Sequence, residues 1–268
     1  MMKLIFITFF ISLLYTSCNN SNANNNDVPT NNTGTSTSSN QFTLIKQHPH
    51  NPDFFIEGLE FKDSLLYESV GDADYLGKSK IAIINQQTGL PTLQTTLNKK
   101  YFGEGLTIIH NKAFMLTYKE EKCFVFDPKT LKQIGEFSYK GEGWGMTNDG
   151  SKIMMSNGSN NISIRNPNTF VEENVIAIFD ENGPVANINE LEYVNGYLYA
   201  NQYQTNYILK IDLKTKMVVK KIDFSSLINQ FIPQNIKNEM NGIAYNKKSN
   251  TFFITGKNWN TMFEVVIN

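Results

Sequence analysis

A short motif recurs five times along the chain, and this repetition constrains the fold more than any other feature. Each copy has an acidic or amide residue, then Gly or Glu, then a large apolar residue. The copies are Glu57-Gly58-Leu59, Glu104-Gly105-Leu106, Glu142-Gly143-Trp144, Asn189-Glu190-Leu191 and Asn241-Gly242-Ile243. Successive copies begin roughly 40 to 50 residues apart, a period typical of repeat architectures. The motif therefore predicts five structural repeats, each with a polar group at an equivalent position.

A second pattern, out of phase with the first, divides each repeat into strands. β-rich runs end with Asn or Asp, and Thr follows shortly after, in the pairs Asn85/Thr88, Asp127/Thr130, Asn166/Thr169 and Asp212/Thr215. Such side chains hydrogen-bond nearby backbone groups and stabilise tight turns. The second repeat then divides into four short strands, at Gly105–Ile109, Ala113–Thr117, Cys123–Phe126 and Gln133–Tyr139. Short strands between turns favour a sandwich, barrel or propeller, and a repeat of four strands selects the β-propeller.

The two ends of the repeat array complement each other. The fifth repeat offers three strands, at Gly242–Tyr245, Thr251–Thr255 and Met262–Ile267, and lacks a fourth. An unassigned strand, Phe42–Gln47, precedes the first motif. Placing it in the last repeat removes the open sheet edges that a protein must otherwise protect. We therefore predict an all-β fold over residues 41–268, a five-bladed β-propeller in which the N-terminal strand closes the last blade.

Residues 1–40 differ in composition from the rest of the chain. A basic start is followed by the apolar run Leu4–Tyr15, which is too short to span a bilayer and is typical of a signal peptide. Thr16 and Ser17 precede Cys18, which indicates a lipoprotein signal peptide over residues 1–17 and lipidation of Cys18. Residues 18–40 are rich in Asn, Ser and Thr and are predicted to form a flexible tether. The alternative is an ordinary secreted protein whose discarded peptide contains Cys18.

These features predict a lipid-anchored protein of the bacterial cell envelope. The Asn-rich composition and the small charged fraction of 18% agree with this location. No acidic run follows Cys18, so we expect the protein to face the periplasm. We expect it to contact the membrane through the lipid on Cys18 and to be a monomer.

Charge, histidine and cysteine patterns argue against several other classes of protein. A net charge of −1 without a basic stripe argues against nucleic-acid binding. His48 and His50 are close in sequence, but no further His or Cys completes a metal site. If Cys18 carries lipid, Cys123 has no disulfide partner, and its alternating β run predicts a buried small hydrophobe. We therefore predict no nucleic-acid partner and no catalytic metal.

The repeated motif also predicts a site. In a propeller the first strand of each blade lines the central channel, so the motif's polar side chains are expected to converge at one mouth. These residues are Glu57, Glu104, Glu142, Asn189 and Asn241. One interpretation is architectural, with each side chain bonding the backbone of a neighbouring blade. The other is a shared site, because carboxylates brought close together must be paired, protonated or metal-bound.

Several longer motifs resemble those of a known enzyme family. They are Leu66-Tyr67-Glu68-Ser69, Tyr101-Phe102-Gly103-Glu104-Gly105-Leu106-Thr107, Gly141-Glu142-Gly143-Trp144-Gly145, Asn189-Glu190-Leu191-Glu192-Tyr193, Ala200-Asn201-Gln202-Tyr203-Gln204-Thr205, Asn241-Gly242-Ile243-Ala244-Tyr245 and Thr255-Gly256-Lys257. In this order they resemble the plant and bacterial (type I) glutaminyl cyclases, or glutamine cyclotransferases. The resemblance implies a five-bladed propeller. It also implies conversion of the N-terminal glutamine of peptides or proteins to pyroglutamate, with release of ammonia. It implies that no cofactor is required. It does not decide whether a structural calcium is bound in the channel.

The resemblance assigns roles to individual residues. Glu104 matches the family's acid/base carboxylate, which takes a proton from the attacking α-amine and returns it to the leaving ammonia. Asn189 and Lys257 match polar residues that stabilise the oxyanion of a tetrahedral intermediate. Trp144 matches an aromatic residue that packs on the glutamine side chain. Gln204 lies in a matching motif and is expected at the substrate site.

The chain departs from the family pattern at three positions. The family's Phe-Thr-Gln-Gly-Leu motif becomes Phe55-Ile56-Glu57-Gly58-Leu59, and Tyr118 and Tyr203 stand where the family has Trp. We expect all three to line the substrate site, and a Glu57 near Glu104 to raise the pKa of the pair. An altered substrate or lost activity would follow if these changes disturb the chemistry. The alternatives are then a propeller that only binds a peptide or glycan and, more distantly, a metal-dependent lactonase.

Overall fold

The computed structural model describes residues 41–235 and 239–268. The predicted signal peptide (1–17), the lipidation site Cys18 and the predicted tether (18–40) lie outside the described residues. Within the described residues no helix is long and apolar enough to cross a membrane.

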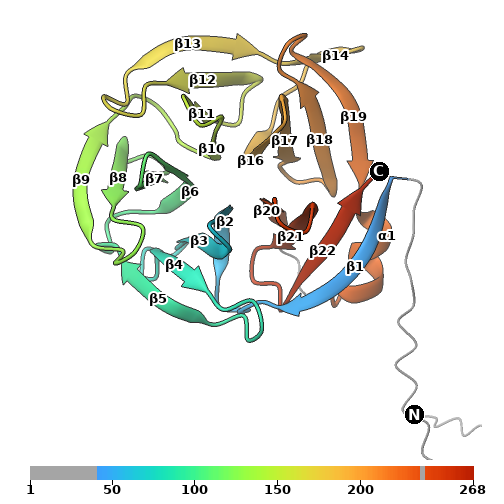
Figure 1. Cartoon of the computed structure of the whole chain (residues 1–268), viewed down its shortest axis with the longest axis horizontal. Helices are drawn as coiled ribbons and strands as arrows, with labels where there is room; N and C mark the ends of the chain where they lie inside the picture. The colour runs from blue at the N-terminus through green and yellow to red at the C-terminus, as the bar shows by residue number, and fades with distance from the viewer. Residues whose placement is uncertain (1–40, 236–238) are drawn as a thin grey trace, which may run out of the picture. The chain divides into compact units, whose positions relative to one another are not determined.

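The described strands form five sheets arranged around a common centre (Figure 1). Blade 1 consists of β2 (Phe55–Lys62), β3 (Leu65–Gly71), β4 (Lys80–Ile84) and β5 (Pro91–Thr96). Blade 2 consists of β6 (Gly103–Ile109), β7 (Lys112–Thr117), β8 (Lys122–Phe126) and β9 (Gln133–Ser138). Blade 3 consists of β10 (Met146–Asn148), β11 (Ile153–Met155), β12 (Asn161–Arg165) and β13 (Glu172–Ala177). The all-β, five-bladed propeller predicted from the sequence is confirmed.

Blades 4 and 5 contain features that the repeats alone did not predict. Blade 4 consists of β16 (Ile188–Val194), β17 (Tyr197–Gln202), β18 (Tyr207–Asp212) and β19 (Met217–Asp223), extended by β14 (Phe179–Asp180) and β15 (Gly183–Pro184). Helix α1 (Ser225–Phe231) follows β19. Blade 5 consists of β20 (Met240–Asn246), β21 (Thr251–Gly256), β22 (Thr261–Ile267) and β1 (Phe42–Pro49).

The N-terminal strand closes the ring as predicted. β1 pairs antiparallel with β22, from Phe42 opposite Ile267 to Pro49 opposite Thr261, and Figure 1 shows the two strands side by side at the outer edge of blade 5. Phe42 also stacks on Phe224, with 4.4 Å between the ring centroids. Closure therefore pairs β1 with β22 through a hydrogen-bonded ladder, and a buried aromatic contact also joins β1 to the segment that follows β19.

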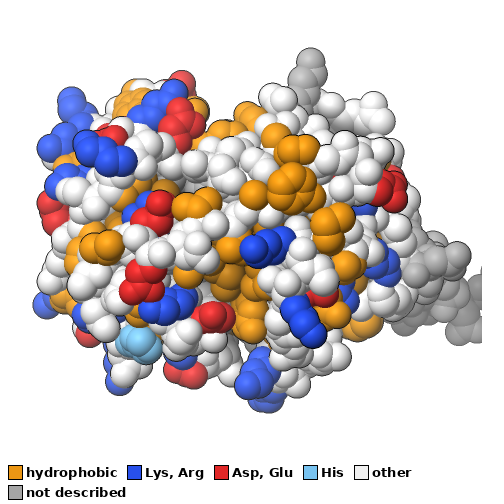
Figure 2. Space-filling model, turned by 90° about the horizontal axis from the view of Figure 1, so that it is seen from above, with side chains coloured by type: hydrophobic (Ala, Val, Ile, Leu, Met, Phe, Trp, Pro, Cys, Tyr) orange, Lys and Arg blue, Asp and Glu red, His pale blue; other side chains and the backbone are white. Residues whose placement is uncertain are grey.

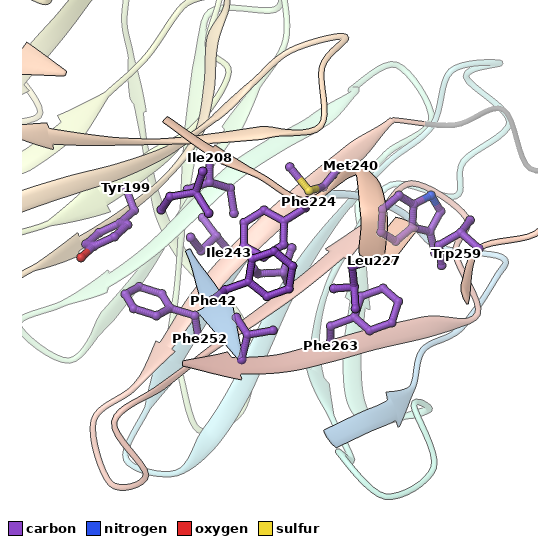
Figure 3. Close-up of a cluster of buried hydrophobic side chains, with 14 of the residues drawn as sticks. Phe42, Tyr199, Ile208, Phe224, Leu227, Met240, Ile243, Phe252, Trp259 and Phe263 are labelled. Atoms are coloured by element: carbon purple, nitrogen blue, oxygen red, sulfur yellow. The ribbon is translucent and has the colours of Figure 1, made fainter. Parts of the chain in front are cut away.

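The core lies in layers between neighbouring blades. The layer between blades 4 and 5 includes Phe42, Phe224 and Leu227, together with Trp259 and Phe263 (Figure 3). Leu227 is the residue that α1 buries in this layer. Cys123 lies in another layer and is buried, as predicted, and burial raises the pKa of its thiol. On the face drawn in Figure 2, basic and acidic side chains are interspersed and do not gather in separate regions.

The Asx and Thr pattern forms the predicted turns. The Asn85 side-chain oxygen accepts hydrogen bonds from the backbone N–H groups of Gln87 and Thr88. The side chain of Asp127 does the same for Lys129 and Thr130. These bonds satisfy backbone donors where the chain reverses, which is why the pattern recurs with the repeat.

Four copies of the repeated motif coincide with a β-bulge at the start of an inner strand. The register between β2 and β3 shifts between Ile56 and Gly58, and that between β6 and β7 shifts between Gly103 and Leu106. Equivalent shifts occur in β16 and β20. A bulge takes residues out of the regular ladder and redirects their side chains. The motif therefore marks the points where polar side chains leave the sheets and point toward the centre.

The glycine of the motif allows neighbouring blades to approach closely. The Gly105 N–H donates to the Trp144 carbonyl, 2.7 Å away in the next repeat. A Cβ atom at position 105 would lie 2.6 Å from that same carbonyl oxygen. Only glycine fits at this contact, which explains why the polar residue of the motif is followed by Gly in this copy.

Candidate active site

A pocket of about 310 Å³ lies where the inner strands begin. It is lined by Phe55, Glu57, Ala73, Tyr75, Phe102, Glu104, Tyr118, Trp144, Asn189, Tyr203 and Lys257. Aromatic side chains therefore surround a small polar group that includes two carboxyls, an amide and an ammonium. Pockets of this kind, mostly apolar with a few convergent polar groups, are typical of small-substrate sites.

The pocket contains almost all of the site residues predicted from the sequence. Glu104 comes from β6, Asn189 from β16 and Lys257 from the turn after β21. Gln204 is the exception. It lies exposed in the turn after β17, with a left-handed φ of 61°, outside the lining of the pocket. The tight turn after β17 directs Tyr203 and Gln204 differently, although both belong to the same motif.

Four lining residues were not predicted: Phe55, Phe102, Ala73 and Tyr75. Phe55 and Phe102 each stand two residues before a motif carboxylate, so a comparison of the repeats would have found them. Ala73 and Tyr75 lie between β3 and β4 and carry no repeated signal.

Glu57 and Lys257 form a buried ion pair on the polar side of the pocket. Lys257 Nζ donates to Glu57 Oε1 at 2.8 Å, and both side chains are almost completely buried. The pKa of Glu57 is raised to about 7, because burial raises it by more than the Lys257 ammonium lowers it. Burial disfavours the ammonium, but the charges of Glu57 and Glu104 outweigh burial and raise the pKa of Lys257. The carboxylate that departs from the family pattern is thus the direct partner of the predicted catalytic lysine.

Asn241 links this ion pair to Asn189. Asn241 Nδ2 donates to Glu57 Oε2 at 3.2 Å and to the Ile56 carbonyl at 3.1 Å. Its Oδ1 accepts a hydrogen bond of 3.1 Å from Asn189 Nδ2. Glu57 therefore holds Lys257 with one oxygen and orients Asn189 through Asn241 with the other.

Glu104 is the second buried carboxyl of the pocket. Burial and the nearby charge of Glu57 raise the pKa of Glu104 well above its usual value, while the Lys257 ammonium acts in the opposite direction. The expectation that Glu57 raises the pKa of Glu104 therefore agrees with their arrangement. A buried carboxyl whose pKa is raised in this way can serve as both proton acceptor and proton donor in catalysis.

Aromatic rings enclose the polar group on several sides. Trp144 and Tyr203 meet edge to face, with 5.3 Å between centroids, and Phe102 lies 5.9 Å from Tyr118. Lys257 Nζ lies 4.4 Å from the centre of the Phe55 ring. The rings exclude water from the charged groups, which strengthens their electrostatic interactions.

The expectation that all five motif residues converge is wrong for Glu142. Its side chain is partly exposed and pairs with Lys119, with 3.4 Å between Oε1 and Nζ. It also accepts a hydrogen bond from Trp144 Nε1. The inner strand of blade 3 begins only at Met146 and is three residues long, so no bulge directs Glu142 toward the centre.

Other buried carboxyls of the channel hold the blades together. Glu190 accepts hydrogen bonds from the N–H groups of Leu59 at 3.1 Å and Ile243 at 2.8 Å. Glu60 accepts from the Thr107 hydroxyl and the Ile108 N–H, on blade 2. These contacts match the architectural interpretation of the inner-strand polar residues.

We expect Glu190→Ala to destabilise the propeller strongly. It would leave the Leu59 and Ile243 N–H groups buried without acceptors, and each such group costs about 1–3 kcal/mol. Urea denaturation measures the loss in free energy of unfolding. Glu190→Gln, which keeps one acceptor oxygen, should lose less stability. Equal stability for both variants would contradict the architectural role.

Among residues 41–235 and 239–268, no group of three or more His, Cys, Asp or Glu side chains is arranged to hold a metal ion. In this part of the chain, therefore, such a group does not supply the donor set for a structural calcium or a lactonase metal.

Comparisons with known proteins agree with this geometry. The sequence model of the glutamine cyclotransferase family matches residues 11–267. A glutaminyl-peptide cyclotransferase of Arabidopsis thaliana is 27% identical over 230 residues, which cover 84% of this chain and 71% of the relative.

Two solved structures share the architecture. The glutaminyl cyclase of Myxococcus xanthus is 30% identical with a TM-score of 0.78, covering 85% of this chain and 96% of that one. The Pan2 WD40 domain of Neurospora crassa, 11% identical with a TM-score of 0.51 and covering 86% and 96%, shares the fold alone. The family match over most of the chain, together with the buried carboxyl, amide and ammonium in one aromatic pocket, shows that this chain belongs to the glutamine cyclotransferase family.

Proposed function

We propose that the chain is a glutaminyl-peptide cyclotransferase, an acyltransferase that converts N-terminal glutamine of peptides or proteins to pyroglutamate and releases ammonia. The observation that carries this proposal is the grouping of Glu104, Asn189 and Lys257 in one pocket with aromatic walls. The family and the names of its relatives support the same reaction. They do not favour the alternative of a propeller that only binds a peptide or glycan.

Glu104 would move the proton that the reaction requires. The α-amine of the substrate attacks the γ-carboxamide carbon, forming the ring C–N bond, and the bond to the amide nitrogen then breaks. The attacking amine loses a proton and the leaving group gains one, so the overall reaction releases neutral ammonia. Glu104 as carboxylate accepts the first proton and then delivers it to the leaving nitrogen, a single group serving both steps.

Asn189 and Lys257 would stabilise the oxyanion of the tetrahedral intermediate. An amide nitrogen carries two hydrogens, and Asn189 Nδ2 gives one to Asn241, which leaves one for substrate. An ammonium carries three, and Lys257 gives one to Glu57. Because Glu57 and Asn241 already orient both donors, little reorganisation is needed when the oxyanion forms. Trp144, Tyr118 and Tyr203 would pack against the glutamine side chain.

A direct assay tests this function. The purified protein is mixed with a dipeptide that begins with glutamine, and ammonia release and loss of the free amine are followed together. We expect both to proceed at the same rate. A protein that remains folded but releases no ammonia at any pH tested would contradict the proposal.

We also expect Glu57→Gln to move the acidic limb of the pH profile. Activity rises with pH as Glu104 loses its proton, and the Glu57 charge holds the pKa of Glu104 up. Removing that charge lowers the pKa of Glu104 and leaves Lys257 unpaired beside it, which lowers it further. The acidic limb of kcat/KM should therefore shift to lower pH. A limb that stays in place or moves to higher pH would show that Glu57 does not influence Glu104.

We propose further that the reaction needs no cofactor, since the side chains above supply proton transfer and charge stabilisation. Treatment with a chelator should leave kcat unchanged.

For location, we propose a monomer anchored to the bacterial cell envelope through lipid on Cys18 and facing the periplasm, on the strength of the sequence of residues 1–40. Metabolic labelling with a fatty acid should mark the wild type. Cys18→Ala should be unlabelled and should move to the soluble fraction. Labelling of both proteins, or of neither, would contradict the anchor. Gel filtration in detergent tests the monomer.

A further inference from the structure

His50 and Glu68 form a second buried pair of ionisable groups, at the junction of blades 5 and 1. His50 follows β1, Glu68 lies on β3, and their side chains are fully buried. His50 Nε2 lies 3.1 Å from Glu68 Oε1, and Nδ1 lies 2.7 Å from the carbonyl oxygen of Trp259. Neither residue lines the pocket, and the proposed mechanism does not use the pair.

The contacts of His50 fix its role as a donor toward Trp259. A carbonyl oxygen only accepts, so Nδ1 carries a proton and donates it to Trp259. Burial lowers the pKa of His50, but the Glu68 charge and both hydrogen bonds outweigh burial and raise it. This shift favours the imidazolium form, with a proton on each nitrogen, more than in a free histidine side chain.

Trp259 belongs to the turn that carries Lys257. The Trp259 N–H donates to the Gly256 carbonyl, and the indole lies directly over Gly256, where a Cβ would come within 2.2 Å of the ring. The indole is buried beside Leu227 and Phe263 (Figure 3). Trp259 thus fixes the turn between β21 and β22 in the core, and Lys257 leaves this turn toward the pocket.

The segment that follows His50 holds the same turn at further points. The His50 N–H donates to the Asn260 carbonyl at 3.0 Å. The Asn258 N–H donates to the Phe54 carbonyl, and Asn258 Nδ2 donates to the Pro52 carbonyl, each at 2.9 Å. Residues 50–54 then lead directly to Phe55 and Glu57 in the pocket. Residues 50–54 therefore connect the turn that carries Lys257 to Glu57, its ion-pair partner.

We propose that His50, held by Glu68, is a positioning residue that sets the place of Lys257 in the pocket through the Trp259 carbonyl. The inference rests on the proposed function, in which Lys257 acts on the oxyanion. A displacement of about 1 Å at a catalytic group can lower the rate about 10²-fold. Because the oxyanion exists only beyond the ground state, the loss falls on kcat and leaves KM nearly unchanged.

The chain offers a matched control two residues earlier, on β1. His48 Nε2 lies 2.8 Å from Glu264 Oε2, a second histidine–carboxylate pair that joins β1 to β22. Its ring packs on Phe253, and neither residue of the pair contacts the turn of Lys257 in the hydrogen bonds described above. His48→Leu should therefore lower stability and leave kcat at the wild-type value.

Two substitutions at position 50 separate positioning from general stability. His50→Leu removes the side-chain hydrogen bonds to Trp259 and Glu68 and should lower kcat about 10- to 100-fold with KM nearly unchanged. His50→Asn places an amide nitrogen near the position of Nδ1, so it can still donate to Trp259 and should recover much of the lost kcat. Glu68→Gln keeps the shape of the pair without its charge and should give an intermediate kcat. Glu68→Gln also provides a test of the proposal if His50→Leu does not fold.

A measurement independent of turnover completes the test. The rate at which an amine-acylating reagent modifies Lys257, followed by peptide mass spectrometry, reports whether Lys257 still pairs with Glu57. We expect faster modification in His50→Leu and Glu68→Gln than in the wild type and His48→Leu, even if the wild type shows no cyclase activity. Unchanged labelling and unchanged kcat in the folded position 50 and 68 variants would overturn the proposal. So would losses of kcat no greater than those in His48→Leu.

Discussion

Glu104→Gln should lower kcat by about 10²–10⁴, the contribution typical of a positioned acid/base group. The substitution keeps the size and burial of the side chain but removes its ability to accept and return a proton. The α-amine then attacks without a base, and the leaving nitrogen receives no proton from the enzyme. Ammonia release from a dipeptide that begins with glutamine measures the effect, and KM should change much less than kcat.

The matched control for Glu104→Gln is Glu60→Gln. Glu60 is also buried in the channel, and burial raises its pKa to about 7, but it hydrogen-bonds Thr107 and Ile108 and does not line the pocket. Glu60→Gln should keep its activity. Similar losses in both variants would indicate that any change among the buried carboxyls disturbs the channel, and Glu104 would then have no special role. Full activity in Glu104→Gln would remove the proposed acid/base group outright.

Lys257→Met should lower both activity and stability. Losing an oxyanion donor typically lowers kcat by about 10²–10³. Breaking a buried ion pair by removing one partner destabilises a fold by about 3–5 kcal/mol, because the other charge stays buried without compensation. The structure leaves Glu57 in that position, with Asn241 as its remaining side-chain partner among the hydrogen bonds described here.

The stability loss in Lys257→Met should depend on pH. Glu57 already has a pKa of about 7 beside Lys257, and without the ammonium its folded-state pKa rises further. A carboxyl whose pKa is higher in the folded than in the unfolded state binds more protons when folded, so stability falls as pH rises. Urea denaturation should therefore show a large deficit above pH 7 and a smaller one at acidic pH. A deficit that is constant with pH would exclude Glu57 as its source.

The double variant Glu57→Gln/Lys257→Met separates the two effects. It removes both charges, so stability should return toward that of the wild type, since replacing a whole buried pair is often close to neutral. Activity should remain low because the oxyanion donor is still missing. A double variant that is as unstable as Lys257→Met would show that packing, not the uncompensated charge, causes the loss.

Repetition in the sequence explains which parts of the structure were predictable. The ring of blades and the closing pair of strands followed from a motif and a turn pattern that recur, because each repeat must bury the same faces. Helix α1 and the strands β14 and β15 occur once and left no repeated signal. The short β10 weakened the prediction for Glu142, whose motif copy looks like the others but begins no regular strand.

The site was predictable residue by residue but not as a network. Family motifs identified Glu104, Asn189 and Lys257 one at a time, and Glu57 appeared only as a departure. Its ion pair with Lys257 joins residues 200 positions apart, which no local pattern reveals. The linking role of Asn241 likewise depends on contacts across blades. Gln204 was included because its motif matched, yet a single tight turn takes its side chain away from the pocket.

Closure of the ring by β1 and β22 also has a consequence for how the protein is made. His48 and Glu264, which pair across this joint, are separated by 216 positions. Contacts between such distant residues form late, because the entropy of closing the intervening chain opposes them. β1 is therefore synthesised long before β22 and exposes an unpaired edge in the meantime, which invites pairing with other chains. We expect yield during production to depend strongly on chaperones and on an intact β22, more than the stability of the finished propeller would suggest.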